Sequence, residues 1–400
     1  MANEYDDIKL RRGTAAQWQS NNTVLGPGEP GLETDTGRLK HGNGTDPWNS
    51  LPYMDQDIAD MVGITQVDMP TQRNSPVTSF RDTLVASAIV AGGGRFEVMY
   101  DDQGYPSVMV RIPKFMREDI HADFGTGVHP AFIVNGVEKS EIWIGMHQAR
   151  VYNSRALSLP GLDPTVSVDW DQANAYCTNK GAGWHLMTNW EWAAVSLWVL
   201  KQVADGSLAH QPRGNTDYGR AHDELQETGT LRNNGDLGST GDRILTGSGP
   251  LTWRHDLSIA GIADLVGNVW EWVGGLKLVD GSIHMPVDNY YGQSDASWGD
   301  SGKDIKSGGY HVWKTATDIF ASGTYNAGYD DALMRSALLL PANVSDQSNG
   351  SYYTNISGER VPRRGGYWFI GSDAGLGALS LTTGRSTSAA GIGFRPAFVA

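Results

Sequence analysis

Glycine and tryptophan together place the strongest constraint on how this chain can fold. Of its 400 residues, 50 are glycine and 14 are tryptophan. Glycine permits tight turns because it has no Cβ atom, and large aromatic side chains anchor short elements to a core. We therefore expect many turns and short strands rather than long helices, in a chain long enough for two or three domains.

The charge of the chain excludes some classes of partner. The formal net charge is −14, and the sequence pI is about 5.1. Nucleic-acid binding needs a basic surface that neutralises phosphates, so we expect no nucleic-acid partner. No stretch has the apolar length of a membrane span, and the acidic start of the sequence is unlike a signal peptide. We therefore expect neither membrane insertion nor a signal peptide.

Cysteine and histidine often act in catalysis or metal binding, but neither forms a recognisable site in this sequence. Cys177 is the single cysteine of the sequence, so neither an internal disulfide nor a cysteine-only metal site can form. It falls on a predicted helix, where we expect a small buried residue. His121 and His129 lie near aspartates and could bind a metal or transfer protons, but their spacing matches no metal motif. We interpret them as residues that shape a loop.

Residues 1–53 form a distinct block of short strands and turns. The segments 25–31 and 41–44 are dense in turn residues. The segments 8–11 and 34–40 have the pattern of short strands. We therefore expect a small all-β unit, which has little core of its own and would be more stable as an oligomer.

This block resembles the N-terminal module of phage tail-fibre proteins and is similar to the β-prism of the major tropism determinant family. The resemblance rests on the segments 10–18, 27–40, 42–44 and 48–53. It implies a homotrimer whose N-terminal module attaches to tail-fibre or baseplate proteins. A generic β-meander is the alternative interpretation. Residues 54–92, which follow, are interpreted as a linker.

From residue 93 onward the pattern changes to mixed α and β elements. We expect strands rich in β-branched and aromatic residues, two helices, and two long loop-rich insertions. The predicted strands are 95–100, 107–112 and 141–145, the predicted helices are 169–179 and 189–203, and the insertions are 205–250 and 285–360.

Four segments in this part of the chain follow the order of a known family. They are 168–177, then 183–194 with Asn-Trp-Glu-Trp, then 264–273 with Gly-Asn-Val-Trp-Glu-Trp, and the ending 391–396. Their succession resembles the formylglycine-generating-enzyme type of C-type lectin fold. It implies that residues 93–400 form a C-type-lectin-like domain with large loop insertions. The expected fold class of the whole chain is mainly β with α+β elements, beginning with a trimeric β-prism.

Glu271 needs a partner, because Trp270 and Trp272 beside it exclude water. A hydrogen-bond network or an arginine is one alternative. The resemblance implies another, a possible structural calcium, with Gly267, Val269 and Glu271 as candidate ligands that supply oxygens. The calcium motifs of sugar-binding lectins, Glu-Pro-Asn and Trp-Asn-Asp, are absent, so we expect no calcium-mediated sugar binding and no required cofactor.

The stretch 365–395 mixes two classes of residue. Glycines, inward apolar residues and arginines have the character of a framework. The remaining positions hold aromatic, aliphatic, acidic and hydroxyl side chains, as in a binding surface. An ordinary core strand followed by a loop is the alternative. The positions that we expect to contact a ligand are Tyr367, Phe369, Ile370, Asp373, Leu376, Ser380, Thr382, Thr383, Thr387 and Ala389.

This pattern resembles the variable region of proteins that diversity-generating retroelements diversify. In that family an adenine-templated cassette is copied with errors, and each of the ten positions can be reached from an Asn codon by changing adenines alone. Lys, Glu, Gln and Met cannot be reached in this way, and none occurs between Gly366 and Arg395.

The two resemblances together imply a function. They imply a virion protein at the tip of a phage tail fibre, made in the host cytoplasm, whose hypervariable face binds a bacterial surface receptor, either protein or glycan. One alternative is an enzyme of the formylglycine-generating or oxidase family, but its oxidase members act through a pair of cysteines that this sequence lacks. The other alternative is a purely structural fibre component.

Overall fold

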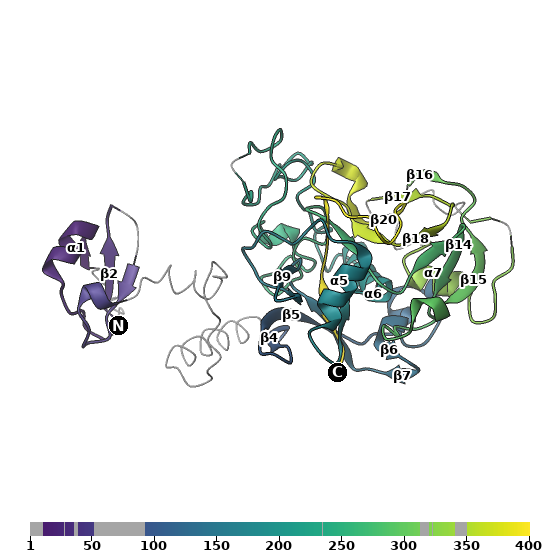
Figure 1. Cartoon of the computed structure of the whole chain (residues 1–400), viewed down its shortest axis with the longest axis horizontal. Helices are drawn as coiled ribbons and strands as arrows, with labels where there is room; N and C mark the ends of the chain where they lie inside the picture. The colour runs from purple at the N-terminus through teal and green to yellow at the C-terminus, as the bar shows by residue number, and fades with distance from the viewer. Residues whose placement is uncertain are drawn as a thin grey trace. The chain divides into compact units, whose positions relative to one another are not determined.

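The chain divides into two compact units, Met1–Thr83 and Leu84–Ala400 (Figure 1). The expected linker, 54–92, lies outside the described residues, as does most of the first predicted strand. The computed structural model describes residues 11–27, 29–35, 39–51, 93–233, 235–312, 320–321, 323–340 and 350–400.

Three short strands form the sheet of the smaller unit. Strand β1 (Arg11–Gly13) pairs in parallel with β2 (Pro30–Glu33), which pairs antiparallel with β3 (Leu39–His41). A glycine is required on β2, because a Cβ atom at Gly31 would lie 2.5 Å from the Trp48 ring. The short strands expected in this block are present, and their assembly into a trimeric β-prism stays a prediction.

One helix corrects the expectation of an all-β unit. Helix α1 (Ala15–Asn21) begins after Thr14, whose side chain accepts a hydrogen bond from the Gln17 backbone while the Gln17 side chain bonds back to Thr14. This capping box satisfies backbone groups that a helix start leaves free. Trp18 of α1 stacks on Trp48 with ring centroids 4.1 Å apart. The helix therefore contributes Trp18 to the unit's small core, which also contains Leu25, Trp48 and Leu51.

A five-stranded sheet joins the two ends of the larger unit. Across the sheet, the order is β11 (Trp184–Leu186), β22 (Pro396–Phe398), β8 (Glu141–Gly145), β5 (Pro106–Pro113) and β4 (Phe96–Tyr100). The last strand of the chain thus lies between strands from the first half of the unit. The three strands expected from the sequence correspond to β4, β5 and β8, which confirms them.

A six-stranded sheet contains the strands of the C-terminal stretch 365–395. Its order is β16 (Gly309–Val312), β17 (Ser351–Thr354), β20 (Gly375–Leu381), β19 (Arg363–Gly365), β12 (Trp270–Trp272) and β21 (Ile392–Phe394). Strand β20 pairs in parallel with β17 and antiparallel with β19, so both of its edges are hydrogen-bonded to neighbours. This position makes β20 an interior strand.

Smaller sheets and short helices complete the larger unit. A four-stranded sheet has the order β15 (Gly299–Asp304), β14 (Ser282–Met285), β13 (Lys277–Val279) and β18 (Glu359–Arg360), and two hairpins are formed by β6 (Ile133–Val134) with β7 (Val137–Glu138) and by β9 (Arg150–Tyr152) with β10 (Arg155–Leu157). The helices are α4 (Arg117–Ile120), α5 (Trp170–Thr178), α6 (Asn189–Ala204) and α7 (Asp331–Ser336).

The fold is mainly β, as the sequence predicts. Helices α5 and α6 confirm the two predicted helices. The region 285–360, expected to be loop-rich, contains β15, β16, β17 and α7 in its described parts. None of the helices in the described part of the chain has the length and apolar character that a membrane span requires.

Helix α6 lies at the centre of the larger core (Figure 1). Trp190 and Trp192 on this helix are fully buried. Their indole Nε1 atoms donate hydrogen bonds to the carbonyls of Pro286 and Leu376, at 3.0 and 2.9 Å. Large buried aromatic side chains with satisfied polar atoms fix the position of α6 against β20.

The carboxylate of Glu271 and the guanidinium of Arg395 form a buried ion pair. The distances are 2.7 Å from Nε to Oε2 and 2.6 Å from Nη2 to Oε1. Arg395 also donates to the carbonyls of Gly145 and Ala263, at 2.8 and 3.0 Å. One guanidinium thus connects β8, β12, the 263 loop and the junction between β21 and β22.

Arg395→Ala should lower the free energy of unfolding by about 3–5 kcal/mol, because it leaves the Glu271 carboxylate buried and unpaired. Arg150→Ala is the matched control, since Arg150 is exposed and donates one hydrogen bond; its effect should stay within about 0.5 kcal/mol. Urea denaturation measures both. Equal losses in the two variants would contradict a structural role for the buried pair.

Candidate functional site

Strand β20 is buried along its whole length. The Leu376 side chain is fully buried, and Ser380 is 1% exposed. The expectation that these two residues contact a ligand is therefore wrong. The physical reason is the position of β20, which has a strand on each edge and Trp192 of α6 packed near Leu376.

Two glycines turn the chain from β19 into the loop 367–374. Gly365 and Gly366 have φ values of +88° and +93°, which side chains with a Cβ atom rarely adopt. A Cβ atom at Gly366 would also lie 2.6 Å from the Cβ of Ala374. The framework role predicted for Gly366 therefore has a steric cause.

The other predicted positions reach the surface to different degrees. Phe369 is 46% exposed. Tyr367 and Ile370 are half-buried, and each has one side against the core. Ala389 is exposed. The remaining half-buried positions are Asp373, Thr382, Thr383 and Thr387.

Six aromatic side chains form a continuous row, which we call the aromatic ladder. In order along the row they are Tyr218, Phe369, Tyr367, Trp270, Tyr353 and Tyr310. Successive ring centroids are 5.7, 4.4, 6.4, 6.2 and 5.5 Å apart, within the range of aromatic contact. The members come from the 205–250 insertion, the 367–374 loop and strands β12, β17 and β16, so only the tertiary structure assembles them.

Asp373 connects the loop to one end of the aromatic ladder. Its Oδ1 accepts hydrogen bonds from the Tyr310 hydroxyl and the Ser351 hydroxyl, both at 2.8 Å, and its Oδ2 accepts one from Tyr353 at 2.9 Å. Burial, followed by this hydrogen bond, raises the pKa of Tyr353, which therefore stays a donor. Asp373 supports the ladder, and its contact with a ligand stays a prediction.

Arg363 of β19 packs against the aromatic ladder from the interior. Its guanidinium carbon lies 5.4 Å from the Trp270 ring centre and 6.0 Å from that of Trp272. Its Nη2 donates to the hydroxyls of Ser380 and Thr382, at 2.9 and 3.4 Å. Burial lowers the pKa of Arg363 to about 10, so the side chain is still a cation at neutral pH.

Arg385 fastens the second half of the C-terminal stretch. It donates hydrogen bonds to Asp171 at 2.8 Å and to Glu359 at 3.1 Å, and it also pairs with Asp295. Its guanidinium carbon lies 4.7 Å from the ring centre of Trp170 on α5. A planar guanidinium suits such a junction, because it can donate in several directions while stacking on a ring.

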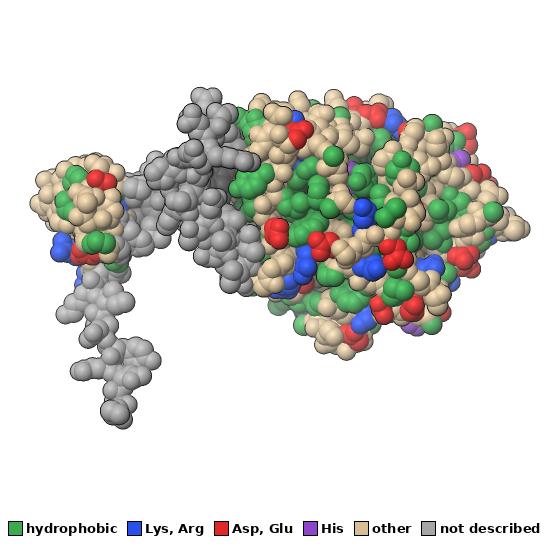
Figure 2. Space-filling view, turned by 90° about the horizontal axis from the view of Figure 1, so that it is seen from below, with side chains coloured by type: hydrophobic (Ala, Val, Ile, Leu, Met, Phe, Trp, Pro, Cys, Tyr) green, Lys and Arg blue, Asp and Glu red, His purple; other side chains and the backbone are tan. Residues whose placement is uncertain are grey.

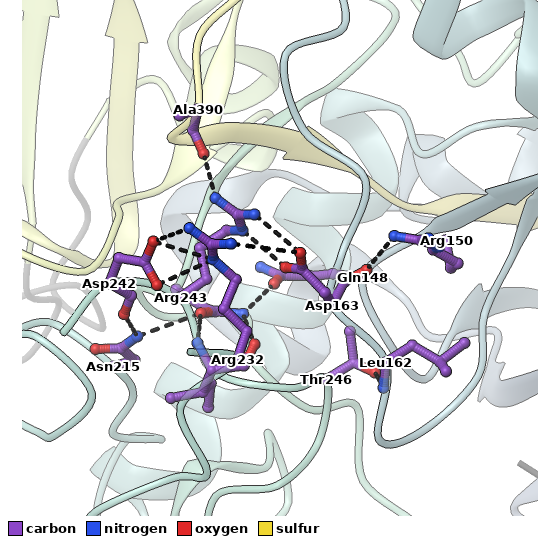
Figure 3. Close-up of polar contacts among 12 residues, drawn as sticks. Gln148, Arg150, Leu162, Asp163, Asn215, Arg232, Asp242, Arg243, Thr246 and Ala390 are labelled. Atoms are coloured by element: carbon purple, nitrogen blue, oxygen red, sulfur yellow. Dashed lines mark hydrogen bonds and ion pairs between the residues drawn. The ribbon is translucent and has the colours of Figure 1, made fainter. Parts of the chain in front are cut away.

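The 205–250 insertion supports the same stretch (Figure 3). Arg243 donates to both carboxylate oxygens of Asp163, at 2.9 and 3.0 Å, and to the carbonyl of Ala390 at 3.3 Å. Beside it, Arg232 forms an ion pair with Asp242. The described part of this insertion contains no helix or extended strand, so these tertiary contacts hold it in place, as expected.

Glu271 does not fit the predicted role of a calcium ligand, because its carboxylate oxygens are already occupied. Both oxygens of Glu271 bind Arg395, and Oε1 also accepts from Gln148 at 3.0 Å. The arginine alternative for Glu271 is therefore confirmed. The carbonyl of Val269 accepts a hydrogen bond from Gln148 at 3.4 Å, and the amide of Gly267 donates to Gly365. Calcium at Gly267 and Val269 stays an untested prediction.

The histidines and the cysteine have structural surroundings. His121 and His129 accept hydrogen bonds from the amides of Asp123 and Ala131 and cap short 3-10 turns, as the loop-shaping interpretation predicts. Burial lowers the pKa of His129 to about 3, so this side chain stays neutral. Cys177 is fully buried, and burial raises the pKa of its thiol. A buried thiol of high pKa is a poor nucleophile.

A family model decides the affiliation of this chain. The model described as the sulfatase-modifying factor enzyme 1-like domain matches residues 74–397. The chain belongs to this family. A second model, the major tropism determinant N-terminal domain, matches residues 8–46. Both resemblances drawn from the sequence motifs are thereby confirmed. No curated protein matches the chain in a sequence comparison.

Solved structures that resemble this member of the sulfatase-modifying factor enzyme 1-like family are distant. The U1 variant of the major tropism determinant is 13% identical, covers 98% of each chain, and has a TM-score of 0.28. PvdO from Pseudomonas aeruginosa is 14% identical over 74% of this chain and 95% of its own, with a TM-score of 0.33. Variable protein 1 of Treponema denticola is 15% identical over 76% and 98%, with a TM-score of 0.29. At these scores the structural likeness carries no argument.

Sequence reasoning missed several residues of the candidate site. Tyr218, Tyr310, Tyr353 and Arg363 lie outside the stretch 365–395 in the sequence but contact it in the structure. No local pattern could have found the tyrosines. Arg363 precedes the stretch by two residues, and it could have been noticed as an arginine at the edge of a predicted framework.

Leu376→Ala should lower the free energy of unfolding by about 2–5 kcal/mol, because it creates a cavity in the core. Phe369→Ala should cost about 1 kcal/mol or less, since it removes only a half-exposed ring that stacks on its neighbours. Chemical denaturation of both variants measures the difference. A large loss in Phe369→Ala would show that this residue belongs to the core and not to the face.

Proposed function

We propose that this protein is the receptor-binding tip of a phage tail fibre and attaches the virion to a bacterial surface through the aromatic ladder and the 367–389 residues around it. The observation that carries the proposal is a row of aromatic side chains that packs on the buried Trp270 and reaches the surface at Phe369 and Tyr310. Phe369 and Tyr310 are 46% and 53% exposed. Exposed aromatic groups beside small polar residues are typical of binding surfaces.

The framework supports this proposal because it separates folding from recognition. Strand β20, Gly366, Arg385 and Arg395 hold the loops through buried or bridging contacts. Side chains such as Phe369 and Ala389 lie outside that framework and can change with little effect on the core. Such a face suits diversification by a retroelement, as the codon pattern predicts.

The match to a major tropism determinant N-terminal domain supports attachment of residues 1–53 to tail-fibre or baseplate proteins. In this proposal the module forms a trimeric β-prism, 54–92 is a linker, and 93–400 is the receptor-binding domain. Three faces per tip would give avidity, so that weak contacts at each face suffice.

We infer that binding rather than catalysis is the function, although the matched family is named for an enzyme. The single cysteine is buried on α5 in a hydrophobic cluster, and burial raises the pKa of its thiol, which makes it a poor nucleophile. On the face shown in Figure 2, Lys and Arg side chains lie among Asp and Glu rather than in a basic patch. This distribution agrees with a partner other than nucleic acid.

Phe369→Ala together with Tyr367→Ala should reduce adsorption of the purified full-length protein to host cells by at least about tenfold, the scale of one or two lost hot-spot contacts. Val137→Ala on β7 is the control, because Val137 is 58% exposed and its hairpin lies at the lower edge of the larger unit in Figure 1, away from β20. A pull-down with fluorescent protein measures binding, and light scattering on the same samples tests the trimer. Unchanged adsorption of the double variant would exclude this face.

Sequencing around the gene should reveal an adenine-rich copy of the codons for 365–395 and a reverse transcriptase gene. Sibling isolates should differ at Tyr367, Phe369, Ile370 and Thr382 while keeping Gly366. Absence of both the copy and the variation would remove the retroelement from the proposal but leave receptor binding in place.

A further inference from the structure

Two adjacent arginines on β19 have opposite surroundings. Arg364 is fully buried, and its guanidinium donates to Asn189 Oδ1 at 2.7 Å and to the carbonyl of Leu338 at 3.2 Å, among other acceptors. Arg363 donates from Nη2 alone, to two hydroxyls. Its Nε is buried without a hydrogen-bond partner in the described part of the chain. The hydrogen-bond donors of Arg364 thus find acceptors within the framework, whereas those of Arg363 are only partly paired.

A largely buried guanidinium with unused donors is costly to the fold. Removing a cation from water is expensive unless acceptors replace the lost hydration. Within the described residues no carboxylate lies at ion-pair distance from Arg363, and the nearest charge effect comes from Tyr367. Such an incompletely paired cation beside a surface indicates a ligand site, because Arg363 is only half-buried as a residue and a bound carboxylate can accept hydrogen bonds from the accessible part of its guanidinium.

The surroundings of Arg363 restrict what carries that carboxylate. The Tyr367 ring packs on the buried Trp270, with ring centroids 6.4 Å apart, and on Phe369, with centroids 4.4 Å apart. Tyr367 is half-buried and Phe369 is exposed, so these two rings are the ones that a ligand can reach. The Tyr367 hydroxyl has no hydrogen-bond partner among the described residues, and the residue is half-buried. A pyranose ring presents C–H bonds on its faces, which contact the negative face of an aromatic ring, and it presents hydroxyls that a tyrosine can bind.

We propose that Arg363, Tyr367 and Phe369 form a subsite for a carboxylate-bearing pyranose, a sugar acid of the bacterial surface. The inference rests on the proposed receptor-binding function and names the ligand class of that face. The guanidinium of Arg363 binds the carboxylate, and the aromatic ladder binds the sugar ring and its neighbours. Because the chain carries a formal charge of −14, long-range attraction to a polyanion is excluded, and recognition of the acid is local.

The hydroxyls that hold Arg363 belong to positions expected to vary. Ser380 and Thr382 accept its Nη2 donors, and an Asn codon gives aspartate by a single adenine change. Aspartate in place of Ser380 would form an ion pair with the Arg363 guanidinium, and this pair would remove the preference for acidic sugars. Diversification can therefore change the ligand class by neutralising a fixed arginine rather than by building a new site.

Binding of matched sugars to the full-length protein tests the proposal. The probes are the methyl glycosides of glucuronic and galacturonic acid, with those of glucose and galactose as neutral counterparts, and saturation-transfer NMR titration gives the affinities. The wild type should bind at least one acidic glycoside about tenfold more tightly than its neutral counterpart, the scale of one charge-assisted hydrogen bond. Arg363→Gln should remove that difference while neutral binding is retained, and Arg363→Lys should restore part of it.

A thermal melt separates this role from a structural one. Arg363→Gln should leave the melting temperature unchanged or raised, because it removes an uncompensated buried cation. Arg364→Gln, the matched control on the same strand, should lower it clearly, because it leaves Asn189 and several carbonyls without their donor. A fall in the melting temperature for Arg363→Gln equal to that for Arg364→Gln would overturn the proposal.

The following outcomes would also overturn the sugar-acid subsite or the proposed function. No preference for acidic glycosides in the wild type, or the same preference in Arg363→Gln, overturns the sugar-acid subsite. Binding of N-acetyl-aspartate amide, without binding of either acidic glycoside, overturns it in favour of a protein carboxylate. Host-cell adsorption that is lost in Phe369→Ala with Tyr367→Ala but normal in Arg363→Gln would leave the proposed function standing and remove only this inference. No adsorption by the wild type would instead remove the proposed function.

Discussion

The buried ion pair between Arg395 and Glu271 is the interaction on which the rest of the larger unit depends. It brings together the end of the chain, strand β12, and the carbonyls of Gly145 and Ala263. Both side chains are almost completely removed from water, where a charge is tolerated only with a well-placed partner. The pair therefore selects the arrangement in which β21 lies beside β12 and β22 lies beside β8.

With those strands in place, the C-terminal stretch is held at both ends while its loops stay outside. Strand β20 is sealed between β17 and β19, and Arg385 and Arg243 hold the segment that returns toward β21. The loop between Gly366 and Ala374 then projects Phe369 to the surface. Rigid support beneath exposed aromatic side chains keeps the entropic cost of binding small, which is the physical advantage of a preorganised face.

The neighbouring arginines of β19 show how one strand serves both stability and recognition. Arg364 points its donors at amide and carbonyl oxygens of α6 and the segment after α7, and it stabilises the core. Arg363 lies between the aromatic rings of β12 and the hydroxyls of β20. Functional sites often retain groups that the fold alone leaves incompletely satisfied, and Arg363 has that character.

The sequence by itself determined the family, the mainly β class and the position of the framework. The helix predicted at 189–203, the strand at 141–145 and the framework glycine at 366 follow from local patterns, because periodicity and backbone sterics act over a few residues. The same local reasoning placed Leu376 and Ser380 on the face, since alternation along a strand cannot reveal that both sides of β20 are covered. Burial on both sides depends on strands and a helix distant in the sequence.

The tertiary structure alone decided which residues complete the face. Tyr218, Tyr310 and Tyr353 join Phe369 in the aromatic ladder from segments up to about 150 positions away. Likewise, the sequence required a partner for Glu271, but only the packing of the last strands selected Arg395 over a metal ion. The physical reason is the same in each case: contacts between distant segments depend on how sheets pair and pack, and no local pattern encodes that pairing.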